Sequence, residues 1–106
     1  MSVINKENLN KVVKLLGCEN LRQTKTYSVV IEYKFRENNK QNIIWGYKRK
    51  DQQYRFYTIA NALTDEQKTR LRGKLCNNDR EYTFNTSSID DVIEVIISGK
   101  RYLNVK

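Results

Sequence analysis

Residues 26–60 read TYSVVIEYKFRENNKQNIIWGYKRKDQQYRFYTIA. From residue 27 to residue 36, apolar and polar side chains alternate with a period of two, which is typical of a β-strand with one buried face. Ile43 to Tyr47 and Tyr54 to Ala60 read as two further strands of the same kind. The stretch therefore predicts three consecutive antiparallel strands joined by short polar connections.

The lengths of the two connections predict a register. A loop of residues 37–41 places Tyr33 opposite Trp45, and a turn at residues 51–52 places Tyr47 opposite Phe56. The second turn is the sensitive point, because a slip of one residue there would turn the whole third strand over. In this register one face holds the apolar set and is expected in the core: Tyr27, Val29, Ile31, Tyr33, Phe35, Ile43, Trp45, Tyr47, Tyr54 and Phe56.

The opposite face of this sheet divides into a cationic half and an apolar half. The half nearer the turns carries Lys34, Arg36, Lys48, Lys50 and Arg55. The far half carries Val30, Ile44, Tyr57 and Ile59. An apolar patch on a sheet has to be covered, either by a helix of the same chain or by a partner.

Helices are expected on both sides of this stretch. Leu9, Val12, Val13 and Leu16 follow the helical period over residues 5–16, with Asn5 as the N-cap. Thr64 to Gln67 form a capping box for a second helix that ends at residues 77–79. Ser88, with Asp91 as its box partner, opens a third helix that ends at Gly99.

Two shorter segments complete the expected order. Residues 81–85 alternate as a short strand, and residues 102–105 are compatible with a final edge strand. The order is then α-β-β-β-α-β-α, an α+β fold in a single domain over residues 1–106.

The charge is strongly positive and unevenly spread. The chain has a net charge of +8, and residues 21–60 hold nine Lys or Arg against three Asp or Glu. Such a surface attracts polyanions and acidic protein surfaces. Without a signal peptide, a membrane-spanning run or CxxC spacing for Cys18 and Cys76, we expect a cytoplasmic protein with free thiols and no membrane contact.

Basic residues interleaved with aromatic residues between Trp45 and Tyr57 are typical of nucleic-acid-binding surfaces. Because the predicted register turns most of these rings inward, we expect contact with the phosphate backbone rather than with bases. No catalytic residue, metal ligand or cofactor is predicted. The expected contact residues are Lys34, Arg36, Lys48, Lys50, Arg55 and Tyr57 on the sheet, with Arg70 and Lys74 on the second helix.

Three functions remain open at this point. The preferred one is a small basic protein, not an enzyme, that binds DNA or RNA without base specificity. The first alternative is a protein-interaction module or inhibitor, for example from a mobile element, that docks on an acidic partner surface. The second alternative is a small nuclease that uses no histidine, since the chain has none.

Two partial resemblances bear on these alternatives. Glu32-Tyr33-Lys34 resembles the E-x-K motif of restriction-endonuclease-like nucleases, which implies metal-dependent hydrolysis; here Asn42 stands on the second strand, where an acid would be needed. The αβββα order of residues 5–76 resembles a double-stranded RNA-binding domain, but the second helix opens Thr64-Asp65-Glu66 where that family has lysines. Neither family is assigned.

Overall fold

The computed structural model describes residues 3–17, 29–36, 39–51 and 53–104, without the side chains of residues 13, 29, 33–36 and 39–41. The described part is an α+β fold with three α-helices and a five-stranded antiparallel sheet, which confirms the predicted class. In chain order the elements are α1 (Lys6–Leu15), β1 (Val29–Arg36), β2 (Asn39–Lys48), β3 (Tyr54–Ile59), the 3-10 turn η1 (Ala60–Ala62), α2 (Asp65–Leu71), β4 (Lys74–Cys76), β5 (Glu81–Thr86) and α3 (Ile89–Tyr102).

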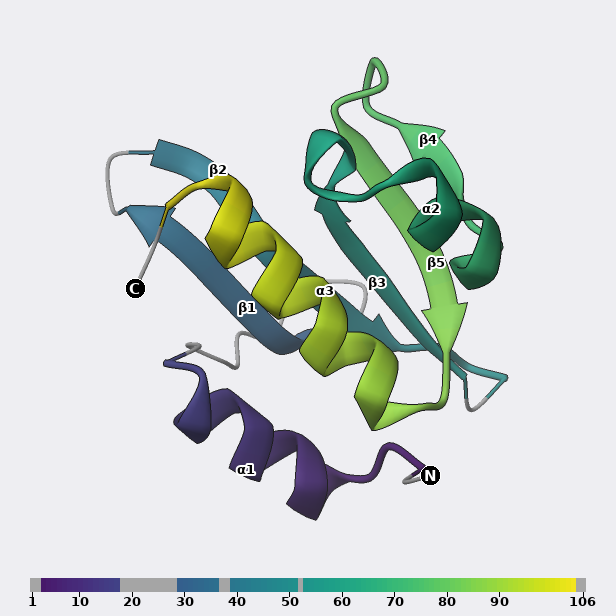
Figure 1. Cartoon of the computed structure of the whole chain (residues 1–106). Helices are drawn as coiled ribbons and strands as arrows, with labels where there is room; N and C mark the ends of the chain where they lie inside the picture. The colour runs from purple at the N-terminus through teal and green to yellow at the C-terminus, as the bar shows by residue number, and fades with distance from the viewer. Residues whose placement is uncertain (1–2, 18–28, 37–38, 52, 105–106) are drawn as a thin grey trace.

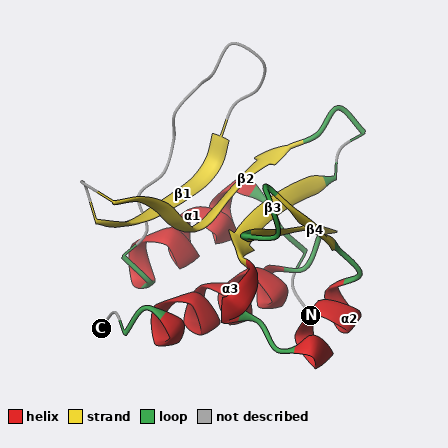
Figure 2. Ribbon diagram, turned by 90° about the horizontal axis from the view of Figure 1, so that it is seen from above, coloured by secondary structure: helices red, strands yellow, loops and turns green. Residues whose placement is uncertain are grey.

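The molecule has two layers. The strands follow the order β1-β2-β3-β5-β4, and α1, α2 and α3 all lie on one face of the sheet (Figures 1 and 2). The opposite face has no helix from the described residues over it (Figure 2). No helix in this part of the chain is long and apolar enough to cross a bilayer.

The core lies between the sheet and the helices. Seventeen buried side chains form one cluster there: Ile4, Leu9, Val12, Ile31, Ile43, Ile44, Tyr54, Phe56, Ala60, Leu63, Leu71, Tyr82, Phe84, Ile89, Val92, Val95 and Ile96. The cluster confirms the expected burial of Ile31, Ile43, Tyr54 and Phe56. Tyr27 and the side chains of Val29, Tyr33 and Phe35, which were also expected in the core, lie outside the described part.

Strand β2 is turned over relative to the predicted register. Trp45 pairs with Tyr57 and Gly46 pairs with Phe56, so the β2–β3 pairing is one residue away from the prediction. The core face of β2 therefore carries Ile44 and Gly46, while Trp45 and Tyr47 lie on the opposite face. The prediction that Trp45 and Tyr47 are core residues was wrong.

A glycine and a bulge explain the inversion. A Cβ atom on Gly46 would lie 2.3 Å from Cδ1 of Phe56, so the Phe56 ring occupies the space that a side chain would need. Between the pairs Tyr33–Ile44 and Lys34–Asn42 the register shifts by one residue, which leaves Ile43 as an extra residue on β2. Because of this bulge, Ile43 and Ile44 are both fully buried.

The two connections also differ in length from the prediction. Arg36 pairs with Asn39, so the first turn is shorter than the expected loop of residues 37–41. Lys48 pairs with Tyr54, so the second connection spans residues 49–53 rather than two residues. Against β3, strand β2 is shifted by one position from the prediction. Against β1 the shift is three positions at Arg36 and one position at Tyr33, because register shifts lie between these two pairs.

The second half of the chain contains one strand that was not predicted. Helix α2 ends at Leu71 because Arg72 adopts a left-handed conformation with φ of 57°. Residues 74–76 then form β4, where the sequence had predicted the end of a helix. Asn77, Asn78 and Asp79 all have positive φ, and they form the β4–β5 turn.

The C-terminal strand was also predicted wrongly. Helix α3 continues past Gly99 to Tyr102, and Leu103 caps it. Gly99 lies inside the helix because it packs on β2: a Cβ atom there would lie 2.7 Å from Cγ2 of Ile43. Val105 lies outside the described residues.

Two of the three predicted helix caps are confirmed. Asn5 and Thr64 are the N-caps of α1 and α2, and both form capping boxes. Ser88 is the N-cap of α3 by position, but its side chain makes no capping hydrogen bond. Thr86 links the two residues of the predicted box instead: its Oγ1 accepts the Ser88 N–H at 3.0 Å and donates to Oδ2 of Asp91 at 2.6 Å.

Candidate nucleic-acid interface

The face of the sheet opposite the helices, here called the outer face, is built from cross-strand neighbours. Directly paired residues of an antiparallel sheet share a face. One row across the sheet runs from β1 to β4 through Glu32, Trp45, Tyr57, Thr83 and Lys74. The next row contains Tyr47, Arg55 and Asn85.

Three rings form an aromatic cluster on this face, defined as Trp45, Tyr47 and Tyr57. The Trp45 and Tyr57 rings are stacked with centroids 4.2 Å apart and an interplanar angle of 4°. Tyr47 lies 6.0 Å from Trp45 and 6.5 Å from Tyr57. All three residues are half-buried. A stacked pair of this kind contributes about 0.5–1.5 kcal/mol beyond its buried area.

The electrostatics of Tyr57 keep its hydroxyl protonated. Burial, and then the neighbouring Tyr47 hydroxyl, raise the pKa of Tyr57 above its ordinary value. The Thr83 hydroxyl and the positive charge of Arg55 oppose this shift without reversing it. At physiological pH Tyr57 is therefore a neutral group that can donate or accept a hydrogen bond.

Two cations lie beside the aromatic cluster. Arg55 donates from Nε to Oδ1 of Asn85 at 3.0 Å, which orients the guanidinium along the outer face. Lys74 is exposed at the β4 end of the first row. Within the described part of the chain, neither Arg55 nor Lys74 forms an ion pair with an acid.

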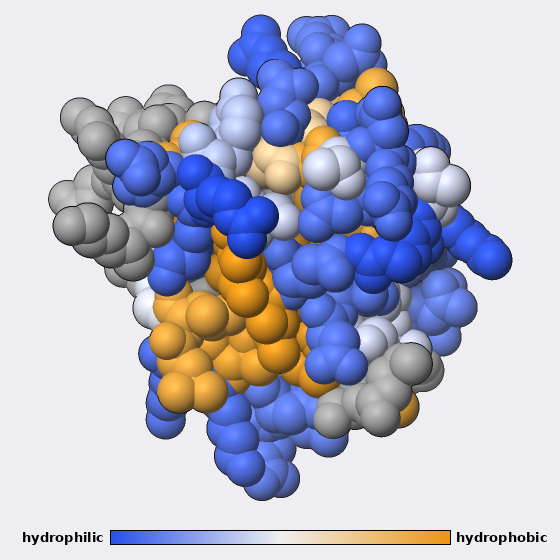
Figure 3. Space-filling view, viewed as in Figure 1, coloured by the Kyte–Doolittle hydropathy of each residue, from blue (hydrophilic) through white to orange (hydrophobic). Residues whose placement is uncertain are grey.

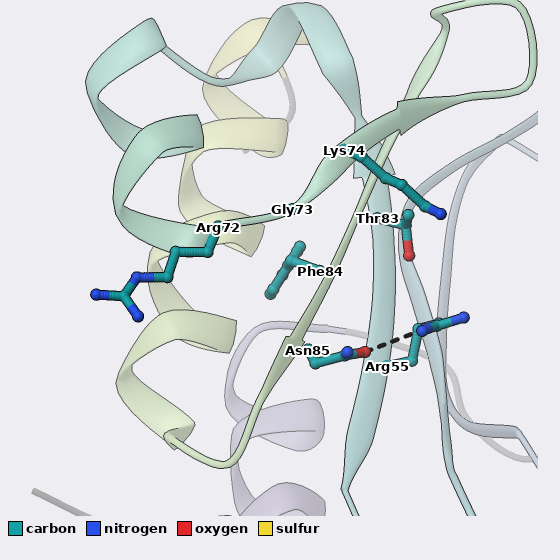
Figure 4. A pocket seen from close by; sticks show the side chains of 7 residues that line it. All are labelled: Arg55, Arg72, Gly73, Lys74, Thr83, Phe84 and Asn85. Atoms are coloured by element: carbon teal, nitrogen blue, oxygen red, sulfur yellow. Dashed lines mark hydrogen bonds between the residues drawn. The ribbon is translucent and has the colours of Figure 1, made fainter.

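A cavity of about 140 Å³ opens next to these cations (Figure 4). Arg55 and Lys74 lie on either side of Thr83, whereas the Arg72 guanidinium points away from the other labelled side chains (Figure 4). The residues that line it include no carboxylate and are Arg55, Arg72, Gly73, Lys74, Thr83, Phe84 and Asn85. The cavity is thus a basic depression at the edge of the outer face.

The structure brings together three of the predicted contact residues and separates three others. Arg55, Tyr57 and Lys74 lie on the outer face, although Lys74 lies on β4 rather than on a helix. Lys48 is paired with the core residue Tyr54, with Nζ 5.8 Å from that ring, so it lies at the rim of the helix side. Lys50 is exposed in the β2–β3 connection.

Arg70 links helix α2 to helix α3. Its guanidinium forms ion pairs with Glu94 and, at 3.7 Å, with Asp91, both on α3. It therefore lies on the helix side, away from the outer face. Lys34 and Arg36 belong to β1 by backbone pairing, and their side chains lie outside the described part.

The apolar patch predicted for this face does not form. Ile44 is fully buried in the core, and Val30 is half-buried and packs against the core. Ile59 is buried, and only Tyr57 of the four remains on the outer face with part of its surface open. Ile44 faces the core between the sheet and the helices, so it is covered within the chain itself.

Four outer-face residues were not among the predicted contacts: Trp45, Tyr47, Thr83 and Asn85. A glycine between two aromatic residues, as at Trp45-Gly46-Tyr47, is a signal for a strand whose glycine faces a ring on the neighbouring strand. Thr83 and Asn85 alternate with the core residues Tyr82 and Phe84, which is the period of a half-buried strand.

Among the described residues, Cys76 is a free thiol. Burial, and then the charge of Glu81, raise the pKa of the Cys76 thiol, which lowers its fraction of nucleophilic thiolate. In the described ranges no three His, Cys, Asp or Glu side chains come together as a metal site would require. Cys18 lies outside these ranges.

Comparisons of the chain with protein-family models, with curated proteins and with solved structures found no match.

Proposed function

We propose that this protein binds nucleic acid on the outer face of its sheet and acts by binding rather than catalysis. The observation that carries the proposal is the position of Trp45, Tyr47 and Tyr57 beside Arg55 and Lys74 on a face with no described helix over it. Rings and cations side by side offer the two contacts that nucleic acids make without base reading.

The aromatic cluster favours a strand with unpaired bases. Base–aromatic stacking contributes about 1–3 kcal/mol per base, and it requires bases that are not already stacked in a duplex. Arg55 and Lys74 supply charge for the phosphates. The acids nearest this surface lie toward its margins, with Glu32 on β1 beyond Trp45 and Glu81 paired with Cys76 and Ile59.

The proposal can be tested with the natural fluorescence of the protein. The chain contains a single tryptophan, Trp45, so its emission reports on the aromatic cluster alone. We expect single-stranded DNA or RNA to quench this emission. The logarithm of the binding constant should fall linearly with the logarithm of the salt concentration. If neither strand changes the emission or binds in an anisotropy assay at low salt, the proposal fails. Parallel incubation with and without magnesium detects any nuclease activity.

A second candidate function is supported by the helix side of the molecule. Leu15 on α1 and Ile97 on α3 are 83% and 43% exposed, and a hydrophobic patch is visible over this side (Figure 3). Lys14, Lys100 and Arg101 lie in the last turns of the same two helices. An apolar patch with a basic margin is complementary to an acidic protein surface.

This second candidate has its own test. An acidic protein captured by the full chain should be lost with Leu15→Ser, because the patch is interrupted, and retained with Trp45→Ala. Capture that is unchanged by Leu15→Ser, or a dimer of the chain itself in sedimentation, would count against it.

A further inference from the structure

The basic cavity of Figure 4 lies where one strand of the sheet stops short of its neighbour. β4 pairs with β5 only over Glu81–Thr83. Before Lys74 the chain lies outside the sheet, because Arg72 and Gly73 connect β4 to the end of α2. No described strand covers Phe84 and Asn85 on that side of β5. The cavity of about 140 Å³ fills this gap, which is room for roughly four or five water molecules at about 30 Å³ each.

Gly73 lets the chain lie close against β5 at the edge of the gap. A Cβ atom at this position would lie 2.0 Å from the carbonyl oxygen of Thr83, so only glycine allows the chain to approach β5 so closely. The Gly73 N–H donates to Oη of Tyr82 at 2.7 Å, which fixes the position of the segment. The mouth of the cavity is therefore formed by backbone and is not filled by a side chain from residue 73.

The charged groups around the gap are all positive. Arg55 donates from Nε to Asn85, and its two terminal nitrogens remain available as donors to a ligand. Lys74 has no acidic partner in the described residues. Asn85 in turn keeps its amide NH₂ as a donor, since its oxygen accepts from Arg55. Donors of this kind, without a carboxylate among the lining residues, suit an anion with several oxygens.

Thr83 adds a buried hydroxyl to the lining. Its side chain is 6% exposed, and its Oγ1 makes no hydrogen bond of normal geometry among the described residues, although it lies close enough to the Tyr57 hydroxyl to oppose the rise in the pKa of Tyr57. A ligand that forms a well-oriented hydrogen bond with this hydroxyl would therefore gain from it. Thr83 lies between Arg55 and Lys74 in the lining (Figure 4).

The cavity is also continuous with the aromatic cluster. Lys74, Thr83, Tyr57 and Trp45 are successive neighbours in one row across β4, β5, β3 and β2. At about 4.8 Å per strand, Tyr57 lies roughly 10 Å and Trp45 roughly 14 Å from Lys74. These spans correspond to a few nucleotide steps of about 3.4 Å in a stacked strand.

We infer that this cavity is a phosphate site, in which Arg55, Lys74 and Asn85 hold one phosphate of a nucleic-acid strand whose neighbouring bases contact Tyr57 and Trp45. The inference rests on the proposed function for the identity of the ligand. The site itself rests on the cavity, its charge and the buried Thr83 hydroxyl in its lining.

The test is an NMR titration of the full chain with two probes. Inorganic phosphate, compared with sodium chloride at equal ionic strength, should shift the amide signals of Gly73, Lys74 and Asn85. Oligothymidine should shift the same amides together with those of Tyr57 and Trp45. Arg55→Gln and Lys74→Gln should each weaken both ligands about tenfold.

Arg72→Gln is the matched control. It removes one charge from the same cavity wall, but the Arg72 guanidinium points away from the other lining side chains (Figure 4), so binding should weaken by no more than about twofold. The amide spectrum of each variant shows that the fold is kept. If Arg72→Gln weakens binding as much as Lys74→Gln does, the site is a diffuse basic surface and the inference is overturned.

The remaining outcomes separate the site from the proposed function. If oligothymidine binds and Trp45→Ala weakens it, but phosphate moves no cavity amide and the two Gln variants bind normally, the phosphate site is overturned and the proposed function stands. If phosphate moves the cavity amides and oligothymidine does not bind, the nucleic-acid ligand and the proposed function are overturned together.

Discussion

The ring of Phe56 lies over the backbone of Gly46, in the space where any other residue would carry its Cβ atom. This pairing fixes which face of β2 enters the core. With Gly46 facing inward, its two neighbours Trp45 and Tyr47 must face outward, because side chains alternate along a strand. One glycine therefore determines that the aromatic cluster lies on the outer face.

Replacing this glycine should strain the sheet. In Gly46→Ala the new Cβ would lie 2.3 Å from Phe56 Cδ1 and 2.8 Å from the Arg55 carbonyl oxygen, so ring and backbone have to move. We expect the free energy of unfolding to fall by about 1–3 kcal/mol, measured by urea denaturation. Combining Gly46→Ala with Phe56→Leu should recover part of that loss, because the smaller side chain relieves the clash. Strictly additive effects of the two changes would show that the contact does not cause the strain.

The same contact shows why the sequence predicted most of the fold and only part of the site. Alternation along β3 and the capping residues Asn5 and Thr64 are local signals, and the structure confirms them. The face of β2 depends on a bulge at Ile43, which has no signal within the strand, and on a ring from another strand, which only the glycine of Trp45-Gly46-Tyr47 indicates. Alternation alone then placed Trp45 in the core.

The second missed feature has a similar origin. In the sequence, Lys74 and Leu75 continue the helical pattern of basic and apolar residues, but the helix ends at Arg72 and Gly73, and residues 74–76 pair with β5 instead. Only this pairing places Lys74 beside Thr83 and Arg55. Arg55 and Tyr57 were predicted on the outer face because the inner and outer faces of β3 follow from its alternation. Arg70 instead forms an ion pair with Glu94 on α3.

Removing the indole should separate binding from stability. Trp45→Ala takes away one half of the stacked pair with Tyr57 on the outer face and leaves the core cluster intact. We expect single-stranded oligonucleotide binding to weaken by about 1–3 kcal/mol in an anisotropy assay. The matched control is Tyr102→Ala, an aromatic residue that is 50% exposed at the end of α3. Equal losses in the two variants would mean that the outer face has no special role.

Arg70 should affect stability and leave binding unchanged. Its ion pairs with Asp91 and Glu94 link α2 to α3, and the side chains are partly exposed. Arg70→Gln should therefore lower the free energy of unfolding by roughly 0.2–1 kcal/mol, with a smaller loss at high salt. The salt slope of nucleic-acid binding should stay as in the parent chain. A decrease of about one in that slope, as expected for a phosphate contact, would place Arg70 in the interface.

Tyr82 should be the most costly hydroxyl to remove. Its buried Oη accepts the Gly73 N–H at 2.7 Å and donates to the Lys68 carbonyl oxygen, so it joins the end of α2 to the sheet. Tyr82→Phe leaves both backbone groups without this partner, and we expect a loss of about 1–3 kcal/mol in thermal or urea unfolding. Faster hydrogen exchange at Gly73 is the specific sign of this cause. The control is Tyr54→Phe, at a buried tyrosine whose hydroxyl makes no such bond among the described residues.

The stability of the protein should respond to Tyr57 at alkaline pH. Burial, and then Tyr47, raise the pKa of Tyr57, so in the unfolded chain this phenol loses its proton first, near its ordinary value of about 10. From that pH upward the folded state holds more protons than the unfolded state, and stability falls until the folded pKa is passed. Tyr57→Phe removes this contribution and keeps the ring. The difference in urea midpoint between Tyr57→Phe and the parent chain should be constant below about pH 9.5 and should then grow in favour of the variant. The tyrosines that do not interact with Tyr57 cancel in that difference, so a flat profile across the whole range would contradict the raised pKa.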